Sequence, residues 1–235
     1  MSPHRLGVLG GTFDPIHNGH VRAAEAARTV LDLETIRVVP AHDPPHRPVD
    51  PRASVFHRFA LVALAINGLT QWELSDAELT RSGPSYTADT LRSLHAEGWS
   101  PSQIFFILGS DAFAEIATWY EFPAVLDAAN FAIVARPGTT LAQATSRTEA
   151  VSQRLRPVGP DGAVASISTV NTGIFLIEAD TPDISSTDIR NRLAAGRSID
   201  NLVPAAVARY IRRQHLYDSS AAVNDLHGKA HRIHR

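Results

Sequence analysis

The sequence begins with a pattern that fixes the start of the fold: a short apolar run, a glycine-rich turn and a helix-forming segment. Residues 5–9 are mostly apolar, and residues 21–31 are rich in Ala, Arg and Glu. The first segment predicts a buried strand and the second predicts a helix. The residues between them, Gly-Gly-Thr-Phe-Asp-Pro-Ile-His-Asn-Gly-His, therefore form a strand-to-helix turn, named here the glycine turn (residues 10–20).

The glycine turn has the features of a phosphate site. Gly10 and Gly11 lack the Cβ atoms that would keep a ligand away from the backbone. Asn18 is a candidate N-cap, and the helix it begins directs unpaired N–H groups and a positive dipole end at the turn. His17 and His20 are three positions apart, so both imidazoles share one face if they lie in the first helical turn. The alternative is a helix cap whose histidines only face solvent.

Two widespread nucleotide-binding motifs do not match this turn. The dinucleotide fingerprint needs the spacing G-x-G-x-x-G, which Gly7, Gly10 and Gly11 do not provide. A P-loop needs a lysine after its glycines, whereas the only lysine of the chain is Lys229. The glycine turn therefore indicates a phosphate site of another kind.

The composition narrows the class of protein. A chain of 235 residues can form one sizeable α/β domain, and its formal charge of −2 gives no sign of a nucleic-acid-binding polycation. There is no cysteine, which excludes disulfides, thiolate metal sites and thiol catalysis. No apolar run approaches membrane-spanning length, and residues 1–5 lead directly into a strand. We expect a soluble, cytoplasmic protein that binds neither nucleic acid nor membranes.

Short apolar runs alternate with helix-forming segments along the chain. This alternation predicts an α/β fold: a Rossmann-like, doubly wound parallel sheet with a small C-terminal helical piece. One domain over residues 1–217 is expected, followed by a disordered tail over 218–235. The segment 140–172 has helix-forming character at first and then no motif. The expected strands are residues 5–9, 35–39, 70–74, 104–108, 131–135 and 174–177, and further helices are expected at 53–66, 87–96, 112–117 and 203–215.

The loop over residues 41–48 is rich in proline and has two interpretations. His42, Asp43 and His46 could hold a metal ion, because histidine and aspartate are common metal ligands. The prolines in and before this loop favour a stiff surface loop instead.

Candidate ligand-binding side chains follow the strand expected at residues 104–108. Ligands of open α/β sheets bind beyond the carboxyl ends of the strands, so Asp111 is well placed to accept hydrogen bonds from ribose hydroxyls. Its alternative role is the N-cap of the next helix. Trp119 and Tyr120 either belong to the core, as such pairs usually do, or offer a ring for stacking.

Two hydroxyl-rich turns each lead into a helix. Ser85 or Thr87 can cap the helix that follows them. In residues 183–190 (Asp-Ile-Ser-Ser-Thr-Asp-Ile-Arg), named here the serine turn, Ser185 and Asp188 have capping-box spacing, which alone is common and structural. The same turn presents hydroxyl groups and an arginine at a helix N-terminus, and this combination also suits a polyphosphate.

Several segments, taken in order, resemble one enzyme family. The glycine turn is similar to the G-G-T-F-D-P-x-H-x-G-H motif of bacterial nicotinate-nucleotide adenylyltransferases, which belong to the H-x-G-H nucleotidylyltransferase superfamily. The serine turn resembles their second signature, I-S-S-T-x-I-R, at every position. The segments Pro-Pro-His-Arg (44–47), Pro-Ser-Tyr-Thr (84–87) and Trp-Tyr (119–120) resemble further elements of the family. The resemblance covers residues 5–217.

This resemblance implies a reaction and a set of site residues. The adenylyl group of ATP would pass to nicotinate mononucleotide, giving nicotinate adenine dinucleotide and pyrophosphate by direct in-line displacement. The residues implied to be catalytic are His17, His20 and Arg190. Those implied to bind ATP are Gly10, Gly11, Thr12, Phe13, His17, His20, Gly109, Ser186, Thr187 and Arg190, and those implied to bind nicotinate mononucleotide are Arg47, Thr87, Asp111, Trp119, Tyr120 and Arg136.

The same resemblance implies Mg²⁺, carried by the phosphates of ATP without a protein side chain as ligand. ATP and nicotinate mononucleotide are the expected partners, and the sequence leaves open whether the protein is a homodimer. Two rival functions remain. Another adenylyl- or cytidylyltransferase of the superfamily would lack the Trp119–Tyr120 pocket, and a nucleotide sensor would bind ATP without releasing pyrophosphate.

Overall fold

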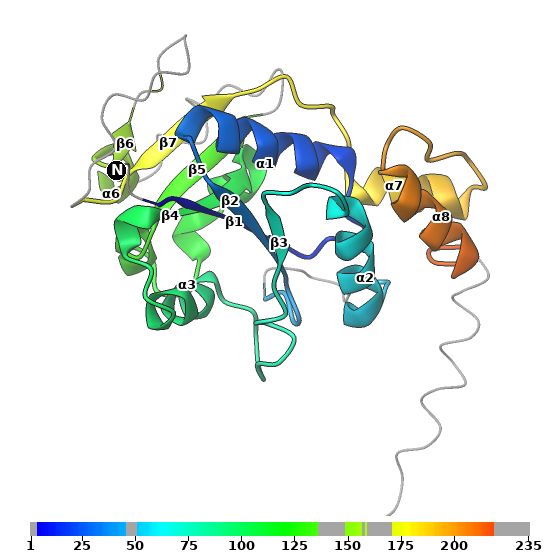
Figure 1. The fold of residues 1–235 in the computed structure, drawn as a ribbon, viewed down its shortest axis with the longest axis horizontal. Helices are drawn as coiled ribbons and strands as arrows, with labels where there is room; N and C mark the ends of the chain where they lie inside the picture. The colour runs from blue at the N-terminus through cyan, green and yellow to red at the C-terminus, as the bar shows by residue number, and fades with distance from the viewer. Residues whose placement is uncertain (1–3, 46–50, 136–148, 157, 159–170, 219–235) are drawn as a thin grey trace, which may run out of the picture.

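The computed structural model describes residues 4–45, 51–135, 149–156, 158 and 171–218. They form a seven-stranded, all-parallel sheet with helices on both faces (Figure 1). The predicted Rossmann-like, doubly wound α/β fold is therefore confirmed. In sheet order the strands are β3 (Trp72–Leu74), β2 (Thr35–Pro40), β1 (Leu6–Gly11), β4 (Ile104–Gly109), β5 (Asn130–Ala135), β7 (Ile174–Glu178) and β6 (Leu155–Arg156).

The central strands are buried on both faces. In β4, Phe105 and Ile107 face one core, whereas Phe106 and Leu108 face the other. Every residue of β5 is buried. A parallel sheet covered by helices on both sides buries both faces of its strands. The strand sequences are therefore continuously apolar and do not alternate between apolar and polar residues.

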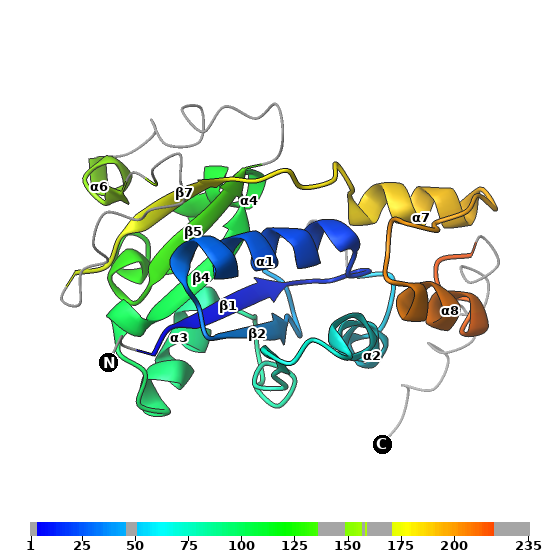
Figure 2. The same cartoon turned by 45° about the horizontal axis from the view of Figure 1, so that its top comes forward.

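The helices divide between the two cores. The first core receives α1 (Asn18–Leu31), α2 (Val55–Ile66), α7 (Ser186–Ala194) and α8 (Ala205–Arg213), and the second receives α3 (Thr87–Ala96) and α4 (Ser110–Ala114). Figure 2 shows α1 on one side of the sheet and α3 on the other. Each long helix buries one stripe, such as Ala24, Ala27 and Leu31 of α1. Among the described residues, no helix combines the length and apolar character needed to cross a bilayer.

The strand order creates a ligand-binding crevice. From β1 the chain proceeds to β2 and β3 on one side, and then returns to β4 on the other side of β1. In open α/β sheets ligands bind where the order reverses, beyond the carboxyl ends of the strands. Those ends are Gly10–Gly11 of β1 and Gly109 of β4. In Figure 2 the arrowhead of β1 points toward the side of the molecule that holds α2, α7 and α8.

Most predicted elements agree with the structure to within a few residues, and the helix predicted at 87–96 agrees at both ends. The final helix is shorter than predicted, because Pro204 is its N-cap and Gln214 its C-cap. The helix predicted at 112–117 is divided into α4 and a 3₁₀ turn, Ile116–Thr118. Short 3₁₀ turns also occur at Pro101–Gln103 and Ala124–Asp127.

The segment 140–172 is described only in part, by the short helix α6 (Glu149–Ser152), by β6 and by a few residues beside them. The predicted disordered tail lies outside the described residues, apart from Asp218.

Candidate active site

A cavity of about 510 Å³ lies at the carboxyl ends of β1 and β4. Its wall combines the glycine turn, the starts of α3 and α4 and the serine turn, which are remote from one another in sequence. The predicted site residues on this wall are Gly10, Gly11, Thr12, Phe13, His17, His20, Thr87, Gly109, Asp111, Trp119 and Ser186.

The other predicted site residues do not form the wall. Thr187 and Arg190 lie in α7 beside it, and Tyr120 is 47% exposed. Arg47 and Arg136 lie outside the described residues.

The two histidines of the glycine turn form one stacked pair. The ring centroids of His17 and His20 are 3.6 Å apart, and the planes meet at 25°. The backbone N–H of His17 donates to Nδ1 of His20 at 3.2 Å, and Phe13 meets the His20 ring edge-on. The prediction that both imidazoles share one face is confirmed. Because His17 is only 3% exposed and His20 is partly buried, both rings have restricted orientations on the cavity wall.

The predicted N-cap of α1 is wrong. The N-cap is His17, and Asn18 is the first residue of the helix. The side-chain amide of Asn18 donates to the carbonyl oxygen of Asn201 at 2.8 Å. An amide that could cap its own helix instead ties α1 to the segment before α8.

Gly10 is required by packing as well as by access to the backbone. A Cβ atom at this position would lie 2.8 Å from Cζ of Phe106, which is closer than real Cβ contacts. The Phe106 ring is in turn edge-on to Trp119, with centroids 6.0 Å apart. Glycine in the turn therefore allows Phe106 to support the aromatic side of the cavity.

The serine turn docks directly on the glycine turn. Ser185 caps α7 by accepting the backbone N–H of Asp188 at 3.0 Å, so its structural interpretation is correct. The next residue, Ser186, donates its hydroxyl hydrogen to the carbonyl of Pro15 at 2.9 Å and also lies on the cavity wall. Arg190 donates to the carbonyl of Asp14 at 2.7 Å. Capping and site formation thus use different residues of the same turn.

Arg58 of α2 is a buried residue that the sequence analysis missed. It is 1% exposed, and its Nη1 donates to the carbonyls of Thr12 and Ala41 at 2.7 and 2.6 Å. Its Nη2 donates to the carbonyl of His42 at 3.2 Å. One guanidinium therefore fixes the backbone of the glycine turn to the loop after β2. No local pattern marks such an arginine, because its acceptors belong to remote backbone segments.

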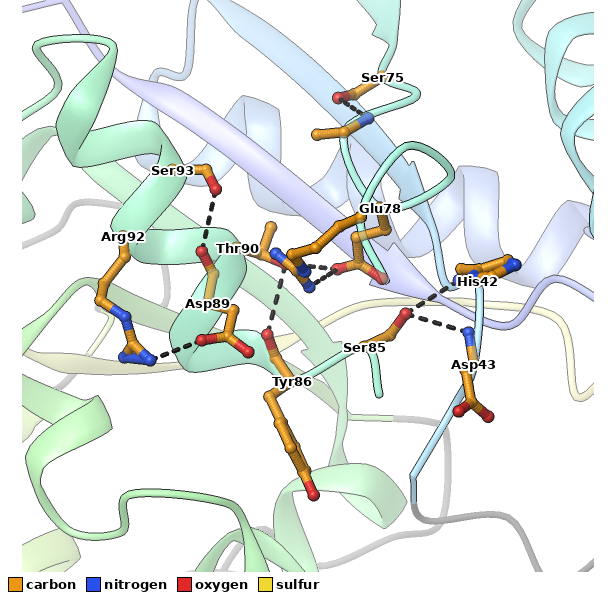
Figure 3. Close-up of polar contacts among 12 residues, drawn as sticks. His42, Asp43, Ser75, Glu78, Ser85, Tyr86, Asp89, Thr90, Arg92 and Ser93 are labelled. Carbon is orange, nitrogen blue, oxygen red and sulfur yellow. Dashed lines mark hydrogen bonds and ion pairs between the residues drawn. The ribbon is translucent and has the colours of Figure 1, made fainter. Parts of the chain in front are cut away.

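The start of α3 forms another part of the wall. The predicted caps of α3 are wrong, since its N-cap is Tyr86 and Thr87 is its first residue. The Ser85 hydroxyl accepts the backbone N–H groups of His42 and Asp43 at 2.9 and 3.2 Å (Figure 3). Ser85 therefore holds the proline-rich loop against α3, and this contact brings Pro44 and Pro45 onto the cavity wall.

The Trp119–Tyr120 segment is joined to α3 by aromatic contacts. The rings of Tyr86 and Tyr120 stack with centroids 4.5 Å apart and planes at 26°. Trp119 lies on the cavity wall against Phe106. The pair is thus divided: the tryptophan borders the cavity, while the tyrosine packs outside it on the residue that caps α3.

Glu78 is a buried carboxyl group on the cavity wall that the sequence analysis also missed. It is 7% exposed and accepts the Thr90 hydroxyl, and Nη2 of Arg81 lies 3.9 Å from its Oε1 (Figure 3 shows Glu78 beside Thr90 and Ser85). Burial raises the pKa of Glu78 above its ordinary value, and the hydrogen bond from Thr90 opposes this shift. A glutamate in a polar turn gives no sequence signal of burial.

Asp111 lies where its prediction placed it, on the wall and in the first turn of α4. It does not cap that helix, because the N-cap is Gly109. Asp111 is exposed and lines the cavity, where its carboxylate offers hydrogen-bond acceptors.

The described residues contain no cluster of three or more His, Cys, Asp or Glu side chains able to hold a metal ion. Of the alternative metal site, His42 and Asp43 are exposed and His46 lies outside the described residues.

Comparison with known proteins agrees with this geometry. The family model described as cytidylyltransferase-like matches residues 8–192. A protein of Geobacter sp. (strain M21), described as a probable nicotinate-nucleotide adenylyltransferase, is 40% identical over 91% of this chain and 98% of its own length. A protein of Yersinia pestis (strain Pestoides F) with the same description is 38% identical over 92% of this chain and 97% of its own.

A solved structure shares the fold. The nicotinic acid mononucleotide adenylyltransferase of Plasmodium falciparum, complexed with NaAD, matches with a TM-score of 0.66 and 20% identity over 91% of this chain and 97% of that one. The relatives above are similar enough, and over enough of their length, to assign the family. The chain belongs to the nicotinate-nucleotide adenylyltransferases, within the cytidylyltransferase-like family.

Proposed function

We propose that this chain transfers the adenylyl group of ATP to nicotinate mononucleotide, giving nicotinate adenine dinucleotide and pyrophosphate in NAD biosynthesis. The observation that supports this most is the meeting of both signatures at one cavity. The stacked His17–His20 pair and Ser186 border one side, and Thr87 and Trp119 border the other. A cavity of this size with two chemically distinct sides suits a nucleotide triphosphate and an aromatic nucleotide together.

The reaction is a direct displacement. A phosphate oxygen of nicotinate mononucleotide forms a bond with the α-phosphorus of ATP. The bond from that phosphorus to the bridging oxygen of the β-phosphate breaks, and pyrophosphate leaves with the electron pair. The attacking phosphate is already ionised near neutral pH, so the step needs no general base. The protein contributes alignment and stabilisation of the negative charge.

We assign the phosphate side of this reaction to the two signatures. His17 and His20 donate to the α-phosphate and to the oxygens of the transition state, where fixed donors are most effective. Ser186, Thr187 and Arg190 bind the β- and γ-phosphates at the N-terminus of α7. Thr12, Phe13 and the backbone of Gly10, Gly11 and Gly109 line the path of the triphosphate.

Mg²⁺ fits this site as an ion carried by ATP. The part of the wall formed by the described glycine and serine turns presents imidazoles, hydroxyls and backbone N–H groups, and no carboxylate. Mg²⁺ prefers oxygen ligands and retains its waters, so phosphate oxygens would hold it here. When bound, it neutralises charge on the leaving pyrophosphate.

The remaining predicted residues form the acceptor side in this proposal. Trp119 stacks on the pyridine ring, and a pyridinium over an indole gains about 1–2 kcal/mol if desolvated. Asp111 accepts from the ribose hydroxyls. The backbone N–H groups of Thr87 and Tyr120 receive the nicotinate carboxylate, and the Tyr86–Tyr120 stack supports this by joining their segments. Arg47 and Arg136 are assigned to the nucleotide phosphate or carboxylate by charge alone.

A coupled pyrophosphate assay tests the proposal. The purified chain receives Mg²⁺-ATP with nicotinate mononucleotide, with its amide or with phosphopantetheine, and CTP replaces ATP in a parallel series. We expect pyrophosphate to be released when ATP is combined with nicotinate mononucleotide. Release only with another acceptor would assign the chain a different transferase activity, and ATP binding without release in any mixture would make it a sensor.

A further inference from the structure

Asp14 of the glycine turn is a buried carboxylate with donors from several segments. It is 2% exposed. Its Oδ2 accepts the backbone N–H of Arg52 at 3.0 Å, and its Oδ1 accepts that of Ala53 at 3.1 Å. A third donor is the hydroxyl of Tyr217, which lies 2.8 Å from Oδ1. Counting Arg190, described below, polar groups from three separate segments of the chain lie around this one carboxylate.

Tyr217 follows α8 and is separated from Asp14 by 203 positions in the sequence. Its side chain is 5% exposed, although its φ of 68° is unusual for a bulky residue. Such a backbone persists when the surrounding contacts over-determine it. Burial and the charge of Asp14 raise the pKa of Tyr217, so the phenol stays protonated and remains a donor.

Arg190 connects this carboxylate to the phosphate site. Its Nη1 lies 3.7 Å from Oδ2 of Asp14 and donates to the Asp14 carbonyl at 2.7 Å. Its Nη2 donates to the hydroxyl of Thr187 at 3.0 Å. The guanidinium is therefore oriented by the residue whose other oxygen accepts the Tyr217 hydroxyl.

We propose that Tyr217 is a positioning residue for ATP: its hydroxyl fixes the Asp14 carboxylate, and Asp14 presents Arg190 to the triphosphate. The inference rests on the proposed adenylyl transfer and adds a residue outside both signatures to it. Without the phenol, Asp14 rotates toward Arg190 or toward water, and the guanidinium loses its fixed orientation. Tyr217 touches neither substrate in this arrangement.

The test compares two tyrosines near the same helix. Tyr217→Phe removes the hydroxyl bound to Asp14, whereas Tyr210→Phe removes the one that lies 3.0 Å from Nδ1 of His57, away from the signatures. Binding of a non-hydrolysable ATP analogue is measured by calorimetry with Mg²⁺, alongside kcat, both KM values and the melting temperature. Both variants are repeated in an Arg190→Ala background.

We expect Tyr217→Phe to weaken binding of the ATP analogue and to lower kcat/KM for ATP, each by about tenfold. This corresponds to losing part of the free energy of one hydrogen bond to a charged group. The KM for nicotinate mononucleotide should change less than about twofold, and Tyr210→Phe should leave the ATP parameters unchanged. In the Arg190→Ala background the Tyr217→Phe effect should nearly disappear, because the residue it acts through is gone.

Two results would overturn the proposal. One is a lower melting temperature for Tyr217→Phe with unchanged ATP parameters, which would make the contact purely structural. The other is an equal loss in the Arg190→Ala background. Asp14→Asn, which keeps the side-chain shape, provides a second test if Tyr217→Phe does not fold. It should likewise weaken binding of the ATP analogue and lower kcat/KM for ATP. Absence of turnover in the wild type would contradict the proposed function instead, while the binding comparison would still report on Tyr217.

Discussion

One buried carboxyl group lies behind the phosphate side of the cavity and another lies on the acceptor side, and the two groups are held differently. Asp14, behind the phosphate side, accepts two backbone N–H groups and the Tyr217 hydroxyl and lies near Arg190. Glu78, on the acceptor side, accepts the Thr90 hydroxyl and lies 3.9 Å from Arg81. Asp14 is thus surrounded by donors from three segments, whereas Glu78 is a carboxyl group whose pKa is raised by burial.

The difference indicates that the two sides of the cavity have different roles in the proposed reaction. A carboxylate with several fixed donors holds its partners in one geometry, which in-line displacement requires. A carboxyl group whose pKa is raised by burial takes up a proton more readily, so its charge and contacts respond to pH. We therefore expect changes on the phosphate side to abolish or greatly slow the reaction, and changes on the acceptor side to alter preference and pH response.

The largest effect should follow removal of the divalent cation. With excess chelator, turnover should fall to background and return on addition of Mg²⁺, because the ion neutralises negative charge that Arg190 and the N-terminus of α7 would otherwise have to stabilise. The melting temperature serves as the control and should not change, since the protein is not expected to hold the ion by itself. Turnover that persists in chelator, or an isolable adenylyl-enzyme, would contradict the mechanism.

The next largest effect should come from His20→Ala. Loss of a donor to the transition state lowers kcat by about 10²–10³. ATP should still bind and circular dichroism should remain near wild type, whereas the melting temperature should fall by a few degrees at most, because the side chain loses one capping hydrogen bond from His17. His215→Ala, at a side chain that is 82% exposed and not part of the cavity wall, is the matched control. Near-normal turnover in His20→Ala would remove this histidine from the chemistry.

On the acceptor side, we expect a preference for nicotinate mononucleotide over its amide of about a hundredfold in kcat/KM. A carboxylate offers acceptors to two backbone donors, whereas an amide must turn its NH₂ toward one of them. Each unmade hydrogen bond to a charged group costs about 1.5–3 kcal/mol. Competition between the two substrates with one enzyme preparation measures the ratio. Equal values would show that water bridges either substituent, and the adenylyl transfer itself would stand.

The smallest effect should be the pH response of Glu78→Gln. Because the folded state raises the pKa of Glu78, its neutral form contributes stability below the ordinary value of 4.5, and this contribution is lost as the pH rises through the folded pKa. The melting temperature of the glutamine variant relative to wild type should therefore rise as the pH rises above the ordinary pKa of 4.5, by about 2–4 °C for each kcal/mol of stability gained. Glu115→Gln, an exposed residue on the same wall, is the control. A difference that does not vary with pH would contradict the buried-charge explanation.

The sequence predicts the residues of this site better than the contacts that hold them. His17, His20, Ser186 and Trp119 belong to short motifs, and the parallel sheet brings such turns to one edge. The cap of α1 was predicted wrongly because the Asn18 amide has a partner in a distant segment. Predictions from neighbouring residues consider only local partners.

Buried polar residues escape the sequence analysis for the same reason. Arg58, Glu78 and Tyr217 lie in segments with ordinary local patterns, and each has hydrogen-bond partners between 12 and 203 positions away. Burial of a charged or phenolic group depends on which remote donors and acceptors the fold supplies. Such residues therefore become visible only when the tertiary structure is known.

The bond between Asp14 and Tyr217 also has a consequence for synthesis of the chain. At about 5–20 residues per second, the ribosome needs about 10–40 s to add the 203 residues that separate these partners. Within that time β4, the parallel neighbour of β1, is synthesised first, and Ser186 and Arg190, which bind the glycine turn, are synthesised later. A nascent chain of this protein therefore emerges with the partners of its glycine turn still missing and with one edge of β1 unpaired.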